Sequence, residues 1–220
     1  MPDQENNYSL VVTEIYKSIQ GESTWTGCPC VFVRLSGCDL RCGWCDSEYT
    51  FSRGDRIAID TIVEKVENHG CPLVEITGGE PLLQPGVHPL ISTLIDRGHR
   101  VIVETGGHLD VSVIDPRAIR VIDVKCPGSG ESQKVRWENL DALRETDQIK
   151  FVLADRVDYD WAKDIISRHG LNERVAVLLS VAHGILPPAD LAAWILDDRL
   201  NVRLQIQLHK YIWSSNQTGT

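Results

Sequence analysis

The sequence lacks the features that would assign it to a membrane, to secretion or to nucleic acid. No apolar run approaches the roughly 20 residues that a membrane-spanning helix needs. The first seven residues, MPDQENN, are polar and acidic, unlike a signal peptide. The formal net charge of −9 leaves no chain-wide basic field for nucleic acid. We therefore expect a cytoplasmic protein that binds neither a membrane nor nucleic acid.

Low-complexity segments, internal repeats and linkers are also missing, and no disulfide framework is expected. The chain has seven cysteines, an odd number, and the expected compartment is reducing. Cys71 and Cys126 are most simply small buried residues. The 220 residues, of which 42% are hydrophobic, suffice for one globular core. We therefore predict a single domain over residues 1–220.

Apolar, β-branched runs alternate with helix-like stretches along the chain. The strand-like runs lie at 10–16, 31–35, 73–77, 101–104, 120–124, 149–153, 175–180 and 202–208. Helices are expected at 59–67 with Asp60 as N-cap, and at 87–97, 137–145, 157–169 and 187–196. This alternation predicts an α/β fold with a mainly parallel sheet. About six units follow the first segment, whereas a closed barrel needs eight, so we expect an open, partial (β/α)6 barrel.

The strongest chemical signal is a cysteine loop that follows the strand at 31–35. Cys38, Cys42 and Cys45 are separated by three and then two residues. Thiolates bind zinc or iron–sulfur clusters, and structural zinc needs four ligands. A fourth ligand would have to come from Cys28, Cys30 or a histidine, which would give a zinc-stabilised binding module. Three ligands alone leave one iron of a cluster open, and an open iron favours chemistry.

A second motif, Thr77-Gly-Gly-Glu-Pro81, follows the apolar strand that begins at Leu73. Its glycines allow close backbone approach to a ligand at the carboxyl end of a strand, where α/β folds bind ligands. Together with the cysteine loop, this motif resembles the radical S-adenosylmethionine superfamily. The resemblance implies a 4Fe–4S cluster on Cys38, Cys42 and Cys45. Its open iron would be chelated by S-adenosylmethionine, which is then cleaved to a 5′-deoxyadenosyl radical.

Further segments narrow the resemblance. They are Glu14-Ile-Tyr-Lys-Ser-Ile-Gln-Gly-Glu22, Glu104-Thr-Gly-Gly107 and Gln207-Leu-His-Lys-Tyr211. With the cysteine loop they resemble the 7-carboxy-7-deazaguanine synthase family of the queuosine and deazapurine pathway. This implies a magnesium-assisted ring contraction of 6-carboxy-5,6,7,8-tetrahydropterin with release of ammonia and catalytic use of S-adenosylmethionine. It also implies a reductant protein such as a flavodoxin or ferredoxin, and a homodimer. A glycyl-radical activase acting on a protein is the alternative enzyme.

The resemblance implies roles for single residues. Arg34 is a charge within an apolar strand, and its planar guanidinium suits two-point binding of a substrate carboxylate. The alternative for Arg34 is a strand-end side chain that reaches solvent. Ser47 stands where the family usually has threonine and would bind magnesium through its hydroxyl. Further substrate contacts are expected from Ile19, Gln20, Gly21 and Thr77.

Other residues are expected to contact the cofactor or to complete the site. The expected S-adenosylmethionine contacts are Gly79, Asp123, Lys125 and Ser180. The segment 123–127 departs from the Ser-Pro-Lys that is frequent in the family. Roles in the active site or in C-terminal packing are expected for Glu104, Gln207, His209 and Lys210. We place His209 and Lys210 at the end of the last strand and interpret Asp46 as a helix cap. The polar tail at 214–220 argues against a substrate contact by a terminal carboxylate.

Overall fold

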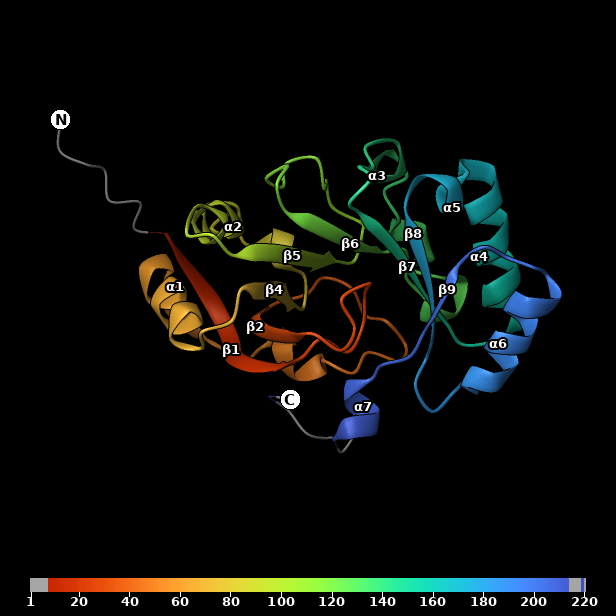
Figure 1. Ribbon diagram of the computed structural model, residues 1–220, viewed down its shortest axis with the longest axis horizontal. Coiled ribbons are helices and arrows are strands. Elements are labelled where there is room, and N and C mark those ends of the chain that lie inside the picture. The colour runs from red at the N-terminus through yellow and green to blue at the C-terminus, as the bar shows by residue number, and fades with distance from the viewer. Residues whose placement is uncertain (1–7, 214–218, 220) are drawn as a thin grey trace.

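A curved β-sheet runs through the whole fold (Figure 1). The computed structural model describes residues 8–213 and 219, and in that part the sheet has nine strands in the order β3-β1-β2-β4-β5-β6-β7-β8-β9. The strands are β1 (Ser9–Ile19), β2 (Pro29–Leu35), β3 (Asp55–Ala58), β4 (Leu73–Gly78), β5 (Arg100–Thr105), β6 (Ile119–Asp123), β7 (Gln148–Leu153), β8 (Ala176–Val181) and β9 (Arg203–Gln205).

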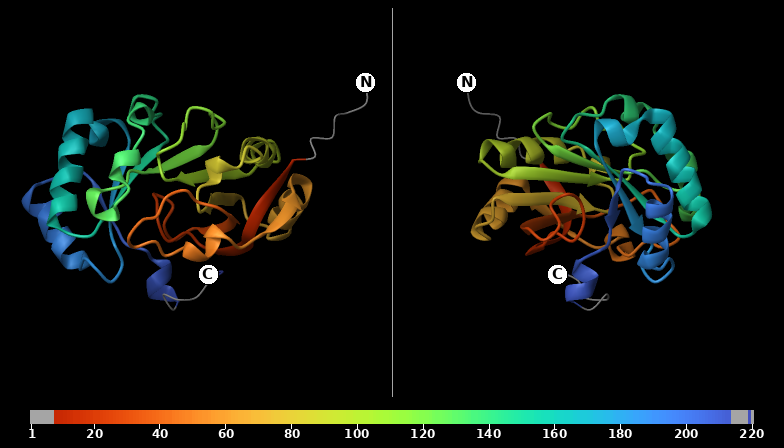
Figure 2. Two further views of the ribbon diagram at one scale, coloured as in Figure 1. Left: turned by 180° about the vertical axis from the view of Figure 1, so that it is seen from behind. Right: turned by 45° about the vertical axis from the view of Figure 1, so that its right-hand side comes forward.

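Helices connect most of the strands. The α-helices are α1 (Ile59–Asn68), α2 (Val87–Asp96), α3 (Glu138–Asp141), α4 (Arg156–His169), α5 (Leu171–Arg174), α6 (Pro188–Asp197) and α7 (His209–Ile212). Short 3-10 helices are η1 (Glu48–Phe51), η2 (Pro81–Leu83), η3 (Pro127–Ser129) and η4 (Ser132–Lys134). In Figures 1 and 2, α1 and α2 lie toward the β1 end of the sheet, and α4, α5 and α6 lie toward the β9 end. No helix in the described ranges is long and apolar enough to cross a membrane.

The sheet topology confirms the expected fold class. β1 pairs antiparallel with β2 and β3, and each pairing from β2 to β9 is parallel. The outer strands β3 and β9 do not pair with each other, so the sheet stays open. A mainly parallel sheet with helical connections is the α/β arrangement that the alternating pattern predicts.

The strands carry an apolar side and a polar side. Successive side chains of a strand point to opposite faces. In β4, Val74 and Ile76 are fully buried in the apolar core, whereas Glu75 and Thr77 line a cavity. In β7, Phe151 belongs to the core and Lys150 lines the same cavity. The parallel strands therefore direct one set of alternating residues into the core and the other toward a polar interior.

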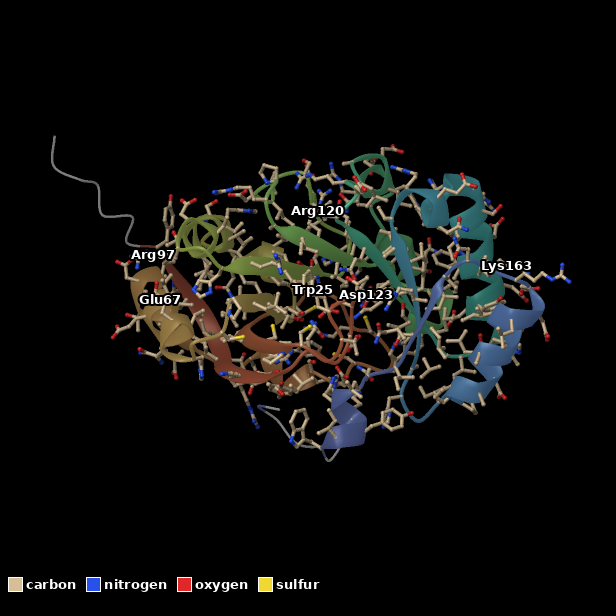
Figure 3. The ribbon with its side chains drawn as sticks, viewed as in Figure 1. Trp25, Glu67, Arg97, Arg120, Asp123 and Lys163 are labelled. Carbon is tan, nitrogen blue, oxygen red and sulfur yellow. The ribbon has the colours of Figure 1, made fainter. Side chains whose placement is uncertain are left out.

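One charged residue points into the core side instead. Arg120 of β6 is fully buried and donates to both oxygens of the buried Asp147, and also to the carbonyls of Val111 and Ala142. Figure 3 labels Arg120 and Asp123 on the same central strand. Asp123 lines the cavity and Arg120 does not, as their odd spacing in a strand requires.

Two predictions about helices were wrong. Asp60 is not the N-cap of α1, because the cap is Ala58 and Asp60 lies in the first turn, where a carboxylate complements the helix dipole. The helix expected at 137–145 is only α3, because the following residues form a turn in which Asp147 accepts from the backbone N–H of Arg144. The same carboxylate holds Arg120, so continuing the helix would break that arrangement.

The last strand is shorter than expected. β9 ends at Gln205, and His209 begins the short helix α7 instead of ending a strand. The backbone N–H of Leu208 donates to the carbonyl of Gly21 at 3.0 Å, which draws the chain away from the sheet. Of the tail after residue 213, the structure describes only Gly219, which lines the cavity. The prediction about the rest of that tail lies outside the described residues.

Candidate active site

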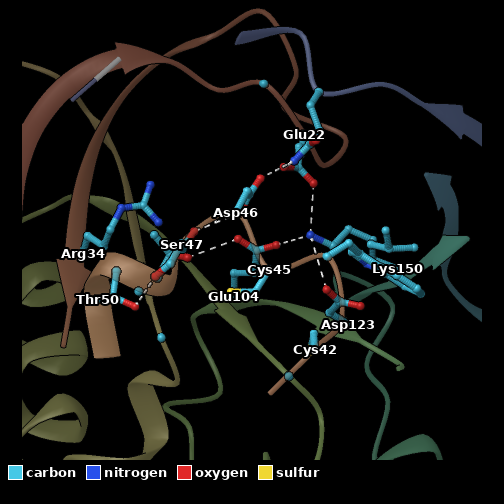
Figure 4. A pocket seen from close by; sticks show the side chains of 18 of the residues that line it. Glu22, Arg34, Cys42, Cys45, Asp46, Ser47, Thr50, Glu104, Asp123 and Lys150 are labelled. Carbon is cyan, nitrogen blue, oxygen red and sulfur yellow. Dashed lines mark hydrogen bonds and ion pairs between the residues drawn. The ribbon is translucent and has the colours of Figure 1, made fainter. Parts of the chain in front are cut away.

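The inner face of the sheet surrounds a cavity of about 770 Å³. Its lining comes from β1, from the parallel strands β2 and β4 to β8, and from the loops that follow them. Ligands of parallel α/β folds bind at the carboxyl ends of the strands, because loops from neighbouring strands converge there. Figure 4 shows part of this cavity, with Cys42 and Cys45 of the cysteine loop and the ammonium of Lys150 among the side chains that line it.

The cysteine loop forms one wall of the cavity. Cys38, Cys42 and Cys45 are half-buried and all line it. Backbone hydrogen bonds hold the loop, with the N–H of Gly37 donating to Thr50 at 2.8 Å and that of Gly43 to Ser129 at 3.0 Å. Burial raises the pKa of all three thiols, because it disfavours the charged thiolate.

The remaining cysteines do not complete a zinc site. Cys30 is fully buried, Cys28 packs against the core, and neither lines the cavity. Among the described residues, no three His, Cys, Asp or Glu side chains lie close enough to hold one metal ion. Structural zinc uses four protein ligands, whereas three thiols on one wall are the donor set of a cluster with one open iron. The donor set on this wall therefore matches the one that the sequence predicted for a cluster.

Two glycines after β4 admit the cysteine loop. A Cβ atom on Gly78, which has a φ of 147°, would lie 2.1 Å from the carbonyl oxygen of Leu35. A Cβ on Gly79 would lie 2.2 Å from the carbonyl oxygen of Gly37. The sequence predicted that these glycines let a ligand approach the backbone. What they admit in this structure is first of all the backbone of the loop that carries the cysteines.

Glu80 connects this turn to the motif after β5. Its buried carboxylate accepts from the backbone N–H groups of Leu82 and Gly106 at 3.0 and 2.8 Å, and from the hydroxyl of Thr105 at 2.8 Å. Burial raises the pKa of Glu80 although these donors oppose the shift. The two sequence motifs therefore form one hydrogen-bonded unit beside the cysteines.

Lys150 is the centre of a group of charged side chains in the cavity. Its ammonium pairs with Glu22 at 3.0 Å, with Glu104, and with Asp123 at 3.7 Å (Figure 4). Burial alone would lower the pKa of Lys150, but these carboxylates raise it well above its ordinary value. Lys125 donates to Asp123 at 2.8 Å, so a second lysine joins the same group.

Sequence reasoning missed Lys150 and Glu75 as cavity residues. Both lie in strands that were described only as apolar, and both line the cavity. The Lys150 side chain is 5% exposed and Glu75 is 4% exposed. The amide of Gln20 donates to the carboxyl group of Glu75. A charge in the middle of an otherwise buried strand was the signal that would have found them, because an unpaired charge is rarely buried.

Arg34 lies inside the cavity wall and not at the surface. Its Nε donates to Glu14 and its Nη2 to the hydroxyl of Tyr16, each at 2.8 Å. The Nη1 atom has no hydrogen-bond partner among the described residues. The side chain is 16% exposed and lines the cavity. The guanidinium is thus held from one side and still presents free donors to a ligand.

The C-terminal segment contacts the cavity residues Glu22 and Asp46. Lys210 pairs with Asp46 at 2.6 Å, and the Gln207 amide donates to Asp46 at 3.2 Å and to Glu22 at 3.0 Å. Asp46 is therefore an ion-pair partner and not a helix cap. The Ser47 hydroxyl donates to Asp46 at 3.0 Å. Burial opposes the shift, yet Lys210 holds the pKa of Asp46 well below its usual range.

Gly21 is where the first loop meets the last helix. A Cβ on Gly21 would lie 2.2 Å from Nδ1 of His209, so only glycine permits this packing. Burial lowers the pKa of His209, which favours the neutral ring at this contact. Every residue that the sequence predicted for the site lines this one cavity: Ile19, Gln20, Gly21, Arg34, Cys38, Cys42, Cys45, Ser47, Thr77, Gly79, Glu104, Asp123, Lys125, Ser180, Gln207, His209 and Lys210.

Known proteins resemble this chain over nearly its whole length. The profile of the Radical SAM superfamily matches residues 32–123. The chain is 45% identical to a 7-carboxy-7-deazaguanine synthase of Koribacter versatilis, covering 96% of this chain and 100% of that protein. It is also 45% identical to one of Chlorobaculum tepidum, with 96% and 97% covered. The crystal structure of QueE from Escherichia coli superposes with a TM-score of 0.75 at 21% identity, covering 91% and 95%.

Proposed function

Because this chain belongs to the 7-carboxy-7-deazaguanine synthase family of radical S-adenosylmethionine enzymes, we propose that it converts 6-carboxy-5,6,7,8-tetrahydropterin to 7-carboxy-7-deazaguanine. The conversion contracts a ring, releases ammonia, requires magnesium and regenerates S-adenosylmethionine, which makes the enzyme a carbon–nitrogen lyase. The observation that carries this proposal is the convergence of the cysteine loop, Arg34 and the charged group around Lys150 on one cavity. We assign the activity to residues 1–220 as a single domain.

Family membership implies an iron–sulfur cluster and S-adenosylmethionine. We assign the cluster to Cys38, Cys42 and Cys45, and the contacts to S-adenosylmethionine to Gly79, Asp123, Lys125 and Ser180, all of which line the cavity. When bound, the cluster and S-adenosylmethionine supply a one-electron cleavage that yields a hydrogen-abstracting radical. The Lys125 ammonium favours the thiolate form of all three cysteines, so it also suits the carboxylate of an amino-acid ligand beside them.

The substrate assignment rests on the other half of the cavity. Arg34 would bind the substrate carboxylate through its free Nη1 side, while Glu14 and Tyr16 keep the guanidinium plane fixed. The rigid placement matters because radical abstraction needs the reacting carbon held in one position. Ile19, Gln20, Gly21 and Thr77 would contact the pterin ring, with Glu104, Gln207 and His209 completing the wall.

Ser47 is our candidate magnesium ligand. Magnesium prefers oxygen ligands and keeps several waters, so one hydroxyl from the protein is compatible with a site completed by substrate. Asp46 accepts a hydrogen bond from that hydroxyl at 3.0 Å and is itself fixed by Lys210 at 2.6 Å. The Asp46–Lys210 pair thus orients the Ser47 hydroxyl through the hydrogen bond that this hydroxyl donates to Asp46.

The reaction also needs an electron donor. We propose a flavodoxin or ferredoxin in this role, and a homodimer in a cytoplasmic setting. Half-buried cysteines in a surface-facing loop leave the cluster near enough to the surface for a docked donor. Sedimentation of the reconstituted enzyme tests the dimer, and reduction of the cluster by purified flavodoxin tests the donor.

A product assay tests the main proposal. The anaerobically reconstituted enzyme is incubated with the carboxytetrahydropterin, S-adenosylmethionine, magnesium and dithionite. We expect 7-carboxy-7-deazaguanine and ammonia in equal amounts, with S-adenosylmethionine not consumed. The Cys42→Ala variant is the control and should give neither product. Cleavage of S-adenosylmethionine to 5′-deoxyadenosine and methionine without any deazaguanine would refute the assignment while leaving the superfamily intact.

A further inference from the structure

Glu75 lies on the floor of the cavity, one layer below the predicted substrate residues. It precedes Thr77 by two positions in β4, so both side chains point to the cavity and Glu75 lies farther from the carboxyl end of the strand. In the sheet register it is flanked by Phe32 of β2 and Ile102 of β5. The residue is 4% exposed, and that remaining surface belongs to the cavity lining.

Only one side of the Glu75 carboxyl group is used by the protein. The Gln20 amide donates to Oε2, and Oε1 accepts no hydrogen bond from the described residues. Oε1 is not fully buried, and because Glu75 lines the cavity, this oxygen remains in contact with it. The unused oxygen therefore faces the space that a ligand would occupy.

Within the described ranges, no cation forms an ion pair with Glu75. Lys150 is engaged by Glu22 and Glu104, and Arg34 is engaged by Glu14. Burial, followed by the negative charges of Glu104 and Glu22, raises the pKa of Glu75 well above its ordinary value, and Lys150 and Arg34 oppose this only in part. The titratable or charged groups that face Glu75 from the packed elements are Tyr16, Glu22, Cys30, Arg34, Glu104 and Lys150.

We propose that Glu75 acts as a neutral carboxylic acid whose O–H donates a hydrogen bond from the cavity floor to an acceptor atom of the bound pterin ring. This makes Glu75 a specificity-determining residue, and the inference rests on the proposed function. The carbonyl oxygen of the acid accepts from Gln20, which leaves the hydroxyl as the oxygen that faces the cavity. The same Gln20 belongs to the loop that is expected to contact the substrate, so the acid and the amide form one recognition unit.

A neutral acid at this point selects among ring edges. A ring oxo group or an unprotonated ring nitrogen accepts a hydrogen bond from the O–H. An amino group placed there would bring its own N–H donors against the O–H donor of Glu75. A buried donor that loses its partner costs enough free energy to change affinity by roughly tenfold to a hundredfold. A carboxylate would select the opposite edge, so the protonation state of Glu75 decides which heterocycles bind.

Two substitutions separate the neutral acid from a carboxylate. Glu75→Gln keeps the shape, the acceptor for Gln20 and a donor toward the cavity, whereas Glu75→Leu removes all polar groups. Binding of the carboxytetrahydropterin is measured by calorimetry on the anaerobic holoenzyme with S-adenosylmethionine. We expect Glu75→Gln to bind within about threefold of the native enzyme and Glu75→Leu to bind about tenfold or more weakly. Iron content and thermal unfolding verify that both variants fold.

Infrared difference spectroscopy adds a readout that a purely structural role would not move. The native protein should show a carboxylic-acid C=O stretch that is absent from Glu75→Gln and that shifts when the pterin is added. If Glu75→Gln binds as weakly as Glu75→Leu, or if the pterin leaves the band unchanged, the inference is wrong while the proposed function stands. If the native enzyme does not bind the pterin at all, both fail.

Discussion

Lys210 in the last helix donates to the Asp46 carboxylate at 2.6 Å, directly beside the third cysteine of the loop. The Gln207 amide supports the same carboxylate, and Asp46 in turn accepts from the hydroxyl of Ser47. A residue near the C-terminus thereby fixes the position of a candidate magnesium ligand near the N-terminus. This contact gives Lys210 and Gln207 of the C-terminal motif a structural role in the cavity.

The first prediction concerns this pair. Lys210→Met should raise the magnesium concentration needed for half-maximal activity several-fold, because Asp46 no longer holds Ser47 in place. Lys210→Arg keeps the charge and should restore most of the native value. The measurement is product formation as a function of magnesium concentration at saturating substrate. An unchanged magnesium requirement in Lys210→Met would show that the pair has no positioning role.

Arg34 gives the second prediction. Arg34→Lys keeps a positive charge but loses the planar fork and the two bonds that fix it to Glu14 and Tyr16. We expect KM for the pterin to rise by about tenfold or more, since charge-assisted two-point bonds are among the stronger hydrogen bonds. The visible absorption of the cluster should stay native. Loss of the cluster in this variant would mean that Arg34 supports the fold and not the substrate.

The third prediction concerns the turn after β4. Gly79→Ala places a Cβ atom 2.2 Å from the carbonyl oxygen of Gly37 and should displace the cysteine loop. The reconstituted variant should hold markedly less iron per chain. Gly43→Ala, in the cysteine loop itself, is the matched control, because the added Cβ would lie 3.8 Å from its nearest neighbour, the carbonyl oxygen of Gly128. Equal iron content in the two variants would contradict this account of the motif.

The fourth prediction concerns stability away from the cavity. Arg120→Met should lower the free energy of unfolding by about 3–5 kcal/mol, since it leaves the Asp147 carboxylate buried without its partner. The double variant Arg120→Met with Asp147→Leu should recover most of that loss. Urea unfolding of the apo-protein measures both. A small effect of the single variant would indicate that water or Arg144 compensates.

The fifth prediction concerns pH. Glu75 has a folded pKa above its unfolded value of about 4.5, so its contribution to stability is complete below that pH and is lost as pH rises toward the folded pKa. Glu75→Gln removes this loss. The variant should therefore gain stability relative to the native protein as pH rises from about 4.5 to about 8. Thermal unfolding at several pH values measures the difference, and a constant offset would contradict a raised pKa.

Local signals in the sequence were sufficient to predict the fold class, whereas the candidate site residues came from the resemblance to a known family. Strand runs such as 73–77 and the glycine turn after them specify βα units without long-range information. In a parallel sheet the ends of such units converge on one edge. The motif residues therefore reached one cavity although they are dispersed along the chain.

What the sequence did not predict depends on partners far apart in the chain. The ion-pair role of Asp46 needs Lys210, 164 residues away, and no local pattern indicates it. The short α3 depends on Asp147, which serves Arg120 at a separation of 27 residues. Glu75 and Lys150 were missed for a different reason, because the strands that contain them were interpreted by their apolar majority.

The C-terminal contacts with the site also have a consequence for the order of events during synthesis. Contacts of residues 205–210 with Gly21, Glu22 and Asp46 span 161 to 185 positions. At about 5–20 residues per second, the ribosome delivers Lys210 roughly ten to thirty seconds after Asp46. During that interval Asp46 stands next to the third cysteine without the partners that later fix it. Cluster insertion can thus precede the C-terminal contacts, and completion of the chain then fixes Asp46 and Ser47 beside a loop that already holds its cysteines.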